Sequence, residues 1–175
     1  DFYGVCKIVT EHLARLFRKK HGLDCTGMRY MSVYGYGKAA QVARGSLSPF
    51  HIELIEKPAL GKPGKSPYAD ALLDWIYVED AARATVMASE IMNNPSVSLN
   101  ICGQRAKISE LADIVRRILP DAQISVEPGD WAFPPYTYKS DVTEAEIGYK
   151  PQFTLEEGLR RNINMLRVRN NLPEL

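Results

Sequence analysis

Tyr3 and Lys7 have the residue types and the spacing that acid–base chemistry requires. Residues four apart on a helix share one face, which brings the two side chains together. A neighbouring ammonium favours the phenolate form of tyrosine, so the lysine would activate the phenol and the tyrosine would transfer the proton. The same spacing recurs at Tyr34 and Lys38, where two intervening glycines disfavour a helix. Because the spacing is common on helices, a solvated surface pair is the alternative interpretation.

The elements that must position this pair alternate between helix and strand. Apolar residues at helical spacing predict a helix over residues 2–20, which a basic run and Gly22 would end. Residues 23–33 are typical of a buried strand that ends in a glycine-rich loop. Further strands are expected at 74–78, 97–102 and 123–126, and further helices at 81–91, 109–119, 141–147 and 154–168. This order predicts an α/β fold with a largely parallel sheet, and one continuous unit over residues 1–175.

Three of the expected helices begin at polar residues. Ser109 is expected to cap the helix that it opens, and Thr154 and Glu157 have the spacing of a capping box. Asp80 precedes an alanine-rich helix, where we expect it to act as the N-terminal cap.

Composition and charge exclude several classes of partner. The chain of 175 residues is 45% hydrophobic and 25% charged, as soluble globular chains are. Its net charge of +1 gives no overall attraction to polyanions, so nucleic acid is not expected as the main partner. The longest uncharged stretch, residues 91–104, is too short to span a membrane. The three cysteines have neither disulfide-framework nor metal-ligand spacing, which predicts a cytoplasmic setting and no metal site.

Several segments occur in an order that resembles one enzyme family. They read YGVCK over residues 3–7, TGMRYMSVYG over 26–35, DWIYVEDAA over 74–82, and LNICG, SEL, SD, IGYKP and LEEGL after residue 98. Together they resemble the extended short-chain dehydrogenases/reductases, in particular the NAD-dependent epimerases and dehydratases. The resemblance covers essentially the whole chain. It implies the C-terminal part of a doubly wound, Rossmann-like parallel sheet with a small α/β substrate-binding domain.

The resemblance also implies roles for individual residues. Tyr3 matches the catalytic tyrosine, and Lys7 matches the lysine that activates it and contacts the nicotinamide ribose. Tyr30 and Met31 match positions that border the nicotinamide of NAD or NADP, although both also suit an ordinary core. The substrate-binding positions would be Ser32, which stands where asparagine is frequent, and Val33.

One part of the family pattern has no counterpart in the chain. Family members hold the cofactor at a glycine-rich turn and use an upstream Ser or Thr in catalysis, and no such glycine pattern follows a strand in this sequence. The first residues resemble neither a translation start nor a signal peptide, which leads us to expect a piece of a longer protein. We expect the isolated piece to be inactive. The intact protein would act on a sugar or nucleotide sugar by hydride transfer.

Leu73 departs from the pattern of members that act on nucleotide sugars. Those members commonly have an arginine there that grips the diphosphate, and leucine cannot bind phosphate. The basic residues that could compensate are Arg44, Lys62, Lys65 and Arg105. The departure favours an alternative enzyme, an NADP-dependent reductase or dehydrogenase of a small carbonyl compound. A noncatalytic binding module is a third hypothesis.

The apolar stripe of the first helix has two interpretations. Relatives often pack this helix against a second subunit, so the stripe would serve a homodimer. Ordinary core packing explains the same pattern. The stripe consists of Val5, Val9, Leu13 and Leu16.

Overall fold

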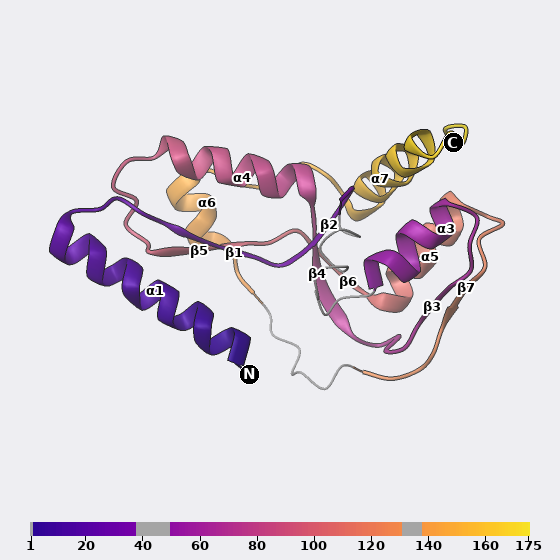
Figure 1. Cartoon of the computed structure of the whole chain (residues 1–175), viewed down its shortest axis with the longest axis horizontal. Coiled ribbons are helices and arrows are strands. Elements are labelled where there is room, and N and C mark those ends of the chain that lie inside the picture. The colour runs from indigo at the N-terminus through magenta and orange to yellow at the C-terminus, as the bar shows by residue number, and fades with distance from the viewer. Residues whose placement is uncertain (1, 38–49, 131–137) are drawn as a thin grey trace.

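The computed structural model describes residues 2–37, 50–130 and 138–175. Figure 1 shows two lobes joined at the middle of the molecule. One contains a parallel pair of strands, β1 (Gly27–Tyr30) and β5 (Ser98–Ile101), with helices α1 (Phe2–His21), α4 (Val78–Glu90) and α6 (Asp141–Ile147) around it. Lys38 and Arg44 lie outside the described residues.

The other lobe is built on a three-stranded sheet. Its strand order is β2 (Ser32–Tyr34), β4 (Leu72–Tyr77) and β6 (Gln104–Lys107), with β2 and β4 parallel and β6 antiparallel to β4. A second parallel pair joins β3 (Gly64–Ser66) to β7 (Ile124–Val126). The helical segments of this lobe are η1 (Ile52–Glu56, a π-helix), α3 (Lys57–Ala59), α5 (Ile108–Ile118) and α7 (Leu155–Arg169). Three of the four described pairings are parallel, which confirms the predicted fold class.

Each lobe buries a hydrophobic core of its own. Trp75 and the two tyrosines Tyr34 and Tyr77 form the centre of the larger core, and α5 and α7 pack their apolar faces onto it. Trp75 donates its indole N–H to the Ala106 carbonyl at 3.0 Å, so its one polar atom is satisfied inside that core. In the smaller core, Ile76, Leu99 and Ile101 pack with α4 and α6 residues.

Two neighbouring segments of the chain cross from the smaller lobe to the larger one. β1 continues into β2 through Met31, whose N–H still donates to the Ile101 carbonyl at 3.2 Å. β5 continues into β6 through Gly103, whose N–H donates to the Asp74 carboxylate at 2.6 Å. The prediction of a single strand over residues 23–33 is therefore wrong. The extended segment begins at Gly27 and divides at Met31 into β1 and β2, because the two strands pair with different partners.

The capping predictions were partly correct. Thr154 and Glu157 form the predicted capping box at the start of α7, with the Thr154 N–H donating to Glu157 at 2.8 Å. Ser109 is not the cap of α5, because that helix already begins at Ile108 and the Lys107 N–H is the one that donates to Glu110, at 2.6 Å.

Asp80 is also not an N-terminal cap, because α4 begins at Val78 and Asp80 lies inside its first turn. Its buried carboxylate instead accepts hydrogen bonds from the N–H groups of Gln152 and Phe153, just before α7. Asp80 therefore joins the start of one helix to the loop that leads into another.

Strands β3 and β6 were not predicted. In β6 only Ala106 is buried, so the segment shows little of the alternation that marks a half-buried strand. None of the helices in the described residues combines the length and apolarity needed to cross a membrane.

Candidate active site

An ion pair fixes how α1 lies against β1. Arg29 of β1 donates from Nε to Glu11 Oε1 at 2.6 Å and from Nη2 to Glu11 Oε2 at 2.5 Å. On the other face of β1, Met28 packs into the smaller core and the Tyr30 hydroxyl hydrogen-bonds to Thr85 of α4. The strand is thus held between α1 and α4, as the alternation of strand side chains requires.

The same helix face carries Tyr3, Lys7 and Glu11, which are spaced four residues apart. In Figure 1, α1 and β1 run in opposite directions, and the N-terminal end of α1 lies toward the end of β1 at which β2 begins. One helical turn advances about as far as two strand residues. Because Glu11 faces Arg29, the side of α1 that bears Lys7 faces the region of Met31.

Tyr3 and Lys7 contact each other, as predicted. Lys7 Nζ lies 5.2 Å from the centroid of the Tyr3 ring. Tyr3 is 68% exposed and Lys7 is also exposed. The pair therefore presents a hydroxyl, from Tyr3, and an ammonium, from Lys7, at the surface. This arrangement can bind a polar ligand and exchange a proton with it.

The four predicted strand residues lie together at the β1–β2 junction, but their side chains differ in direction. The Tyr30 ring reaches α4, and Val33 packs against the smaller core. Met31 and Ser32 are half-buried, and alternation places Met31 on the side of β1 that faces α1. A ligand beside Tyr3 and Lys7 would therefore meet the Met31 side chain, and would meet Tyr30 and Val33 through their backbone.

Glu11 and Arg29 were not predicted as site residues. Glu11 follows Lys7 by one helical turn, and that spacing was the signal available in the sequence. The hydrogen bond from Arg29 holds the pKa of Glu11 below its usual range, so the carboxylate stays charged at neutral pH. No group of three or more metal-ligating side chains occurs among the residues that the structure describes.

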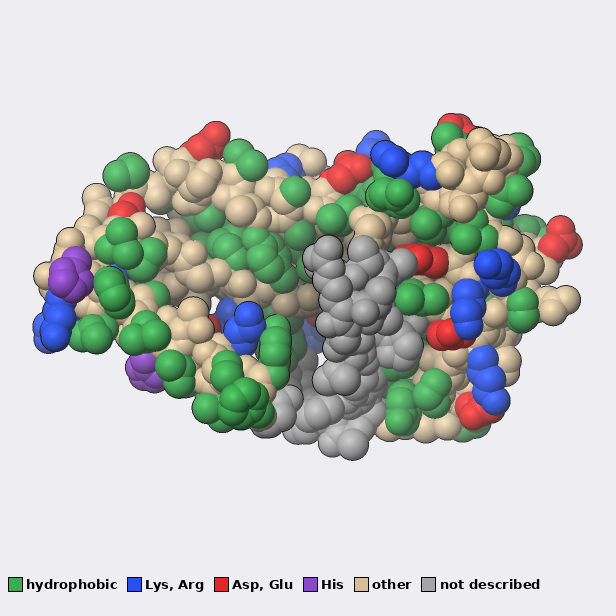
Figure 2. Space-filling model, in the orientation of Figure 1, with side chains coloured by type: hydrophobic (Ala, Val, Ile, Leu, Met, Phe, Trp, Pro, Cys, Tyr) green, Lys and Arg blue, Asp and Glu red, His purple; other side chains and the backbone are tan. Residues whose placement is uncertain are grey.

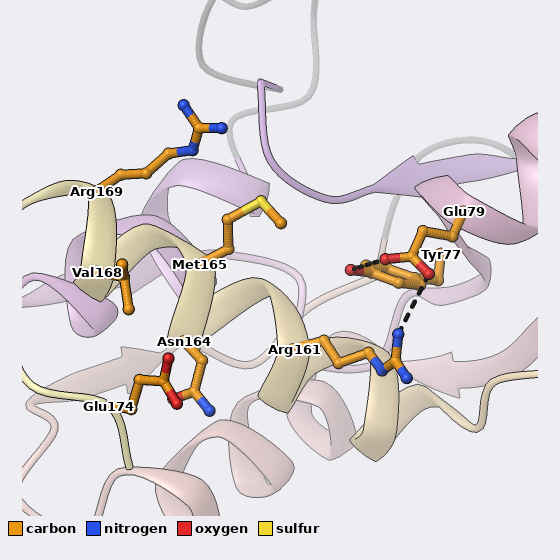
Figure 3. Close-up of a pocket in the computed structure, with 8 residues that line it drawn as sticks. All are labelled: Tyr77, Glu79, Arg161, Asn164, Met165, Val168, Arg169 and Glu174. Carbon is orange, nitrogen blue, oxygen red and sulfur yellow. Dashed lines mark hydrogen bonds and ion pairs between the residues drawn. The ribbon is translucent and has the colours of Figure 1, made fainter.

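A separate pocket of about 380 Å³ lies between α7 and the start of α4 (Figure 3). Arg161 pairs with Glu79 at 3.3 Å, and the Tyr77 hydroxyl donates to the same carboxylate at 3.2 Å. Arg169 points away from these groups and stacks on Tyr36, 4.5 Å from the ring centroid. The pocket contains none of the predicted site residues, so the candidate active site remains at α1 and the β1–β2 junction.

The chain is similar to known proteins over nearly its whole length. The model of the NAD dependent epimerase/dehydratase family matches residues 1–102, more than half of the chain. The chain belongs to this family. The matched region contains α1, β1, β2 and β4, and therefore all of the predicted site residues.

Individual relatives are epimerases and dehydratases. A putative UDP-glucose 4-epimerase of Methanocaldococcus jannaschii is 27% identical over 96% of this chain and 54% of its own length. A dTDP-glucose 4,6-dehydratase of Escherichia coli is 27% identical over 98% of the chain and 49% of its own length. The structure of a Bacillus cereus UDP-glucuronic acid 4-epimerase, in complex with UDP-glucuronic acid and NAD, matches at 25% identity with a TM-score of 0.75, covering 95% of this chain and 52% of that one. The chain thus spans about half the length of the relatives it matches.

The environment of Leu73 bears on the substrate of this family member. Leu73 packs against the larger core and lies opposite Ala106 in the β4–β6 register. Of the basic residues proposed to compensate, Lys65 is held by Glu127 at 2.6 Å, and Arg105 lies across from Asp74 on the neighbouring strand. Arg105 therefore lies one register position from Leu73, on the face of the sheet that carries Asp74.

Proposed function

We propose that the intact protein is an NAD(P)-dependent epimerase or dehydratase that acts on a sugar or nucleotide sugar. The observation that carries this proposal is the contact between Tyr3 and Lys7 on one face of α1. Membership of the family supports the same activity. We further propose that a segment outside these 175 residues supplies the glycine-rich phosphate cradle, and that the chain alone is inactive.

The residues present fit the nicotinamide end of NAD or NADP. Tyr3 and Lys7 offer a hydroxyl and an ammonium on one exposed face, and the half-buried Met31 and Ser32 border the same region. Lys7 would donate a hydrogen bond to the ribose, and Met31 would contact the nicotinamide ring. Bound NAD or NADP supplies hydride transfer, the chemistry that this chain's side chains cannot supply.

Tyr3 would act as the general base. Its phenolate oxygen would take the proton of the substrate hydroxyl while the carbon that bears this hydroxyl gives up its hydride to bound NAD or NADP and becomes a carbonyl carbon. Lys7 stabilises the phenolate by its charge, and Ser32 would donate or accept a hydrogen bond at the substrate. The proton would return from Tyr3 when the carbonyl carbon takes the hydride back, and return of the hydride to the opposite face would complete an epimerisation. In a dehydratase, loss of water comes between the two steps.

A second candidate function follows from Leu73. Because this side chain packs into the core and cannot bind a diphosphate, a small carbonyl compound without phosphate is the alternative substrate. The protein would then be an NADP-dependent reductase or dehydrogenase that releases its cofactor after each turnover. A noncatalytic binding module would bind the cofactor or substrate without turnover.

We also propose a cytoplasmic homodimer that forms through α1. No residue of α1 is buried, and Figure 2 shows hydrophobic side chains gathered along this helix. Val5, Val9, Leu13 and Leu16 are between 43% and 55% exposed, so the described residues leave the apolar stripe open. A second subunit would cover such a stripe.

The deciding experiment is an analysis of the purified intact protein for bound cofactor and turnover. We expect NAD or NADP in the nucleotide released by denaturation, and conversion of UDP-glucose or dTDP-glucose without net consumption of added cofactor. Stoichiometric oxidation or reduction of added NADP with a small carbonyl compound would favour the second candidate. Absence of both cofactor binding and turnover would overturn the enzyme proposal and leave the binding module.

A further inference from the structure

We propose that Arg29 is a positioning residue that keeps Glu11 away from Lys7, and so leaves the Lys7 ammonium free to act on Tyr3. The inference rests on the proposed function, because it assigns a part in that reaction to a residue that touches neither substrate nor cofactor. Arg29 and Lys7 compete for the carboxylate of Glu11, which lies on the same face of α1 as Lys7.

Both oxygens of Glu11 are engaged by Arg29. The two hydrogen bonds are 2.6 and 2.5 Å long and are donated by two different nitrogens of the guanidinium. Such a bidentate pair orients a carboxylate better than a single hydrogen bond does. The Glu11 side chain is only 16% exposed, whereas that of Arg29 is 50% exposed. The carboxylate is therefore held against β1 and cannot turn along its own helix.

Without Arg29, Glu11 would lie within reach of Lys7. The two residues are four apart on α1, the spacing at which side chains of opposite charge pair. Lys7 now contacts the Tyr3 ring, with Nζ 5.2 Å from its centroid. A carboxylate on the ammonium would cancel much of the positive charge that favours a phenolate at Tyr3.

Other cations also act on Glu11. Arg15 and His12 of α1 add to the effect of Arg29 from β1 in stabilising its charge. Arg15 is four residues beyond Glu11 and would compete with Lys7 for a released carboxylate. Removing Arg15 together with Arg29 leaves Lys7 as the one cation at that spacing, so the double change should have the larger effect.

The test is the pH dependence of kcat in the intact protein with its cofactor and substrate. In Arg29→Ala we expect the pH profile of kcat to move to higher pH than in the wild type, by roughly half to one pH unit. The shift should be larger in Arg29→Ala/Arg15→Ala. Arg29→Ala/Glu11→Gln should return to the wild-type profile, because the competing charge is gone. Arg29→Lys, which engages one oxygen at a time, should shift less and serves if Arg29→Ala does not fold. Lys150→Ala, which breaks the remote pair with Glu144, is the control and should shift nothing.

A second measurement does not depend on turnover. Acetylation of Lys7 in the cofactor-free intact protein, followed by peptide mass spectrometry, should be several-fold slower in Arg29→Ala and should recover in Arg29→Ala/Glu11→Gln. The exposed Lys62 provides the internal reference. Unchanged or faster Lys7 acetylation in Arg29→Ala overturns the inference, as does a loss of kcat that is equal at every pH and is not repaired by Glu11→Gln. Slower acetylation in a protein without hydride transfer would instead overturn the proposed function and retain the competition.

Discussion

Asp80 provides the sharpest test of how α4 and α7 are held together. Its carboxylate is 1% exposed and accepts from the Gln152 N–H at 2.9 Å and from the Phe153 N–H at 3.2 Å. It also pairs with Arg83 at 2.9 Å. Asp80→Ala removes the acceptor for two backbone donors and the partner of a partly buried guanidinium.

The expected loss follows from these contacts. An unpaired buried donor costs about 1–3 kcal/mol, and Phe153 is the less exposed of the two residues that donate to Asp80. Arg83 is 28% exposed at its side chain and can regain water, so its contribution is discounted. We expect Asp80→Ala to lower the free energy of unfolding by about 3 kcal/mol. Asp80→Asn keeps one acceptor oxygen and should lose about 1 kcal/mol.

Urea denaturation, followed by the fluorescence of the buried Trp75, measures both losses. Asp113→Asn is the matched control, because it removes a carboxylate that pairs with Arg116 at the surface, where exposed pairs contribute less than about 1 kcal/mol. A loss in Asp80→Ala no larger than that of Asp113→Asn would refute the assignment of Asp80 as the link between the two helices.

Two further predictions concern the sheet of the larger lobe. Gly158→Ala should lower the melting temperature although alanine favours helices by about 1 kcal/mol, because the new methyl group would overlap the Tyr34 hydroxyl; an unchanged or higher melting temperature would contradict this packing. Burial raises the pKa of Asp74, so its ionisation costs stability as the pH rises through that pKa. Asp74→Asn keeps an acceptor for the Gly103 N–H. In urea titrations, its free energy of unfolding should rise relative to that of the wild type as the pH increases from 4 to 8. A difference in unfolding free energy that does not vary with pH would contradict this expectation.

The parts of the fold and site that could be predicted were local. The Tyr3–Lys7 contact and the Thr154 capping box depend on residues three or four apart in sequence, and the structure has both. The apolar stripe likewise marked the length of α1. In each case the interaction partners could be read from one segment.

The parts that could not be predicted depend on distant partners. The division of the strand at Met31 follows from pairing with β5 before it and β4 after it, and neither partner is encoded within the segment. Asp80 acts through Gln152, 72 residues away. Glu11 lies on the predicted face of α1, but its engagement by Arg29 becomes visible only when β1 is laid against the helix.

The central claim is that Tyr3 carries the proton during hydride transfer, and single-turnover kinetics of Tyr3→Phe in the intact protein test it most directly. The variant keeps the ring beside Lys7 and removes only the hydroxyl. We expect hydride transfer to slow by about 100-fold or more, while Tyr36→Phe, which removes a phenol hydroxyl outside the site, stays at the wild-type rate. Hydride transfer in Tyr3→Phe at the wild-type rate would contradict the account.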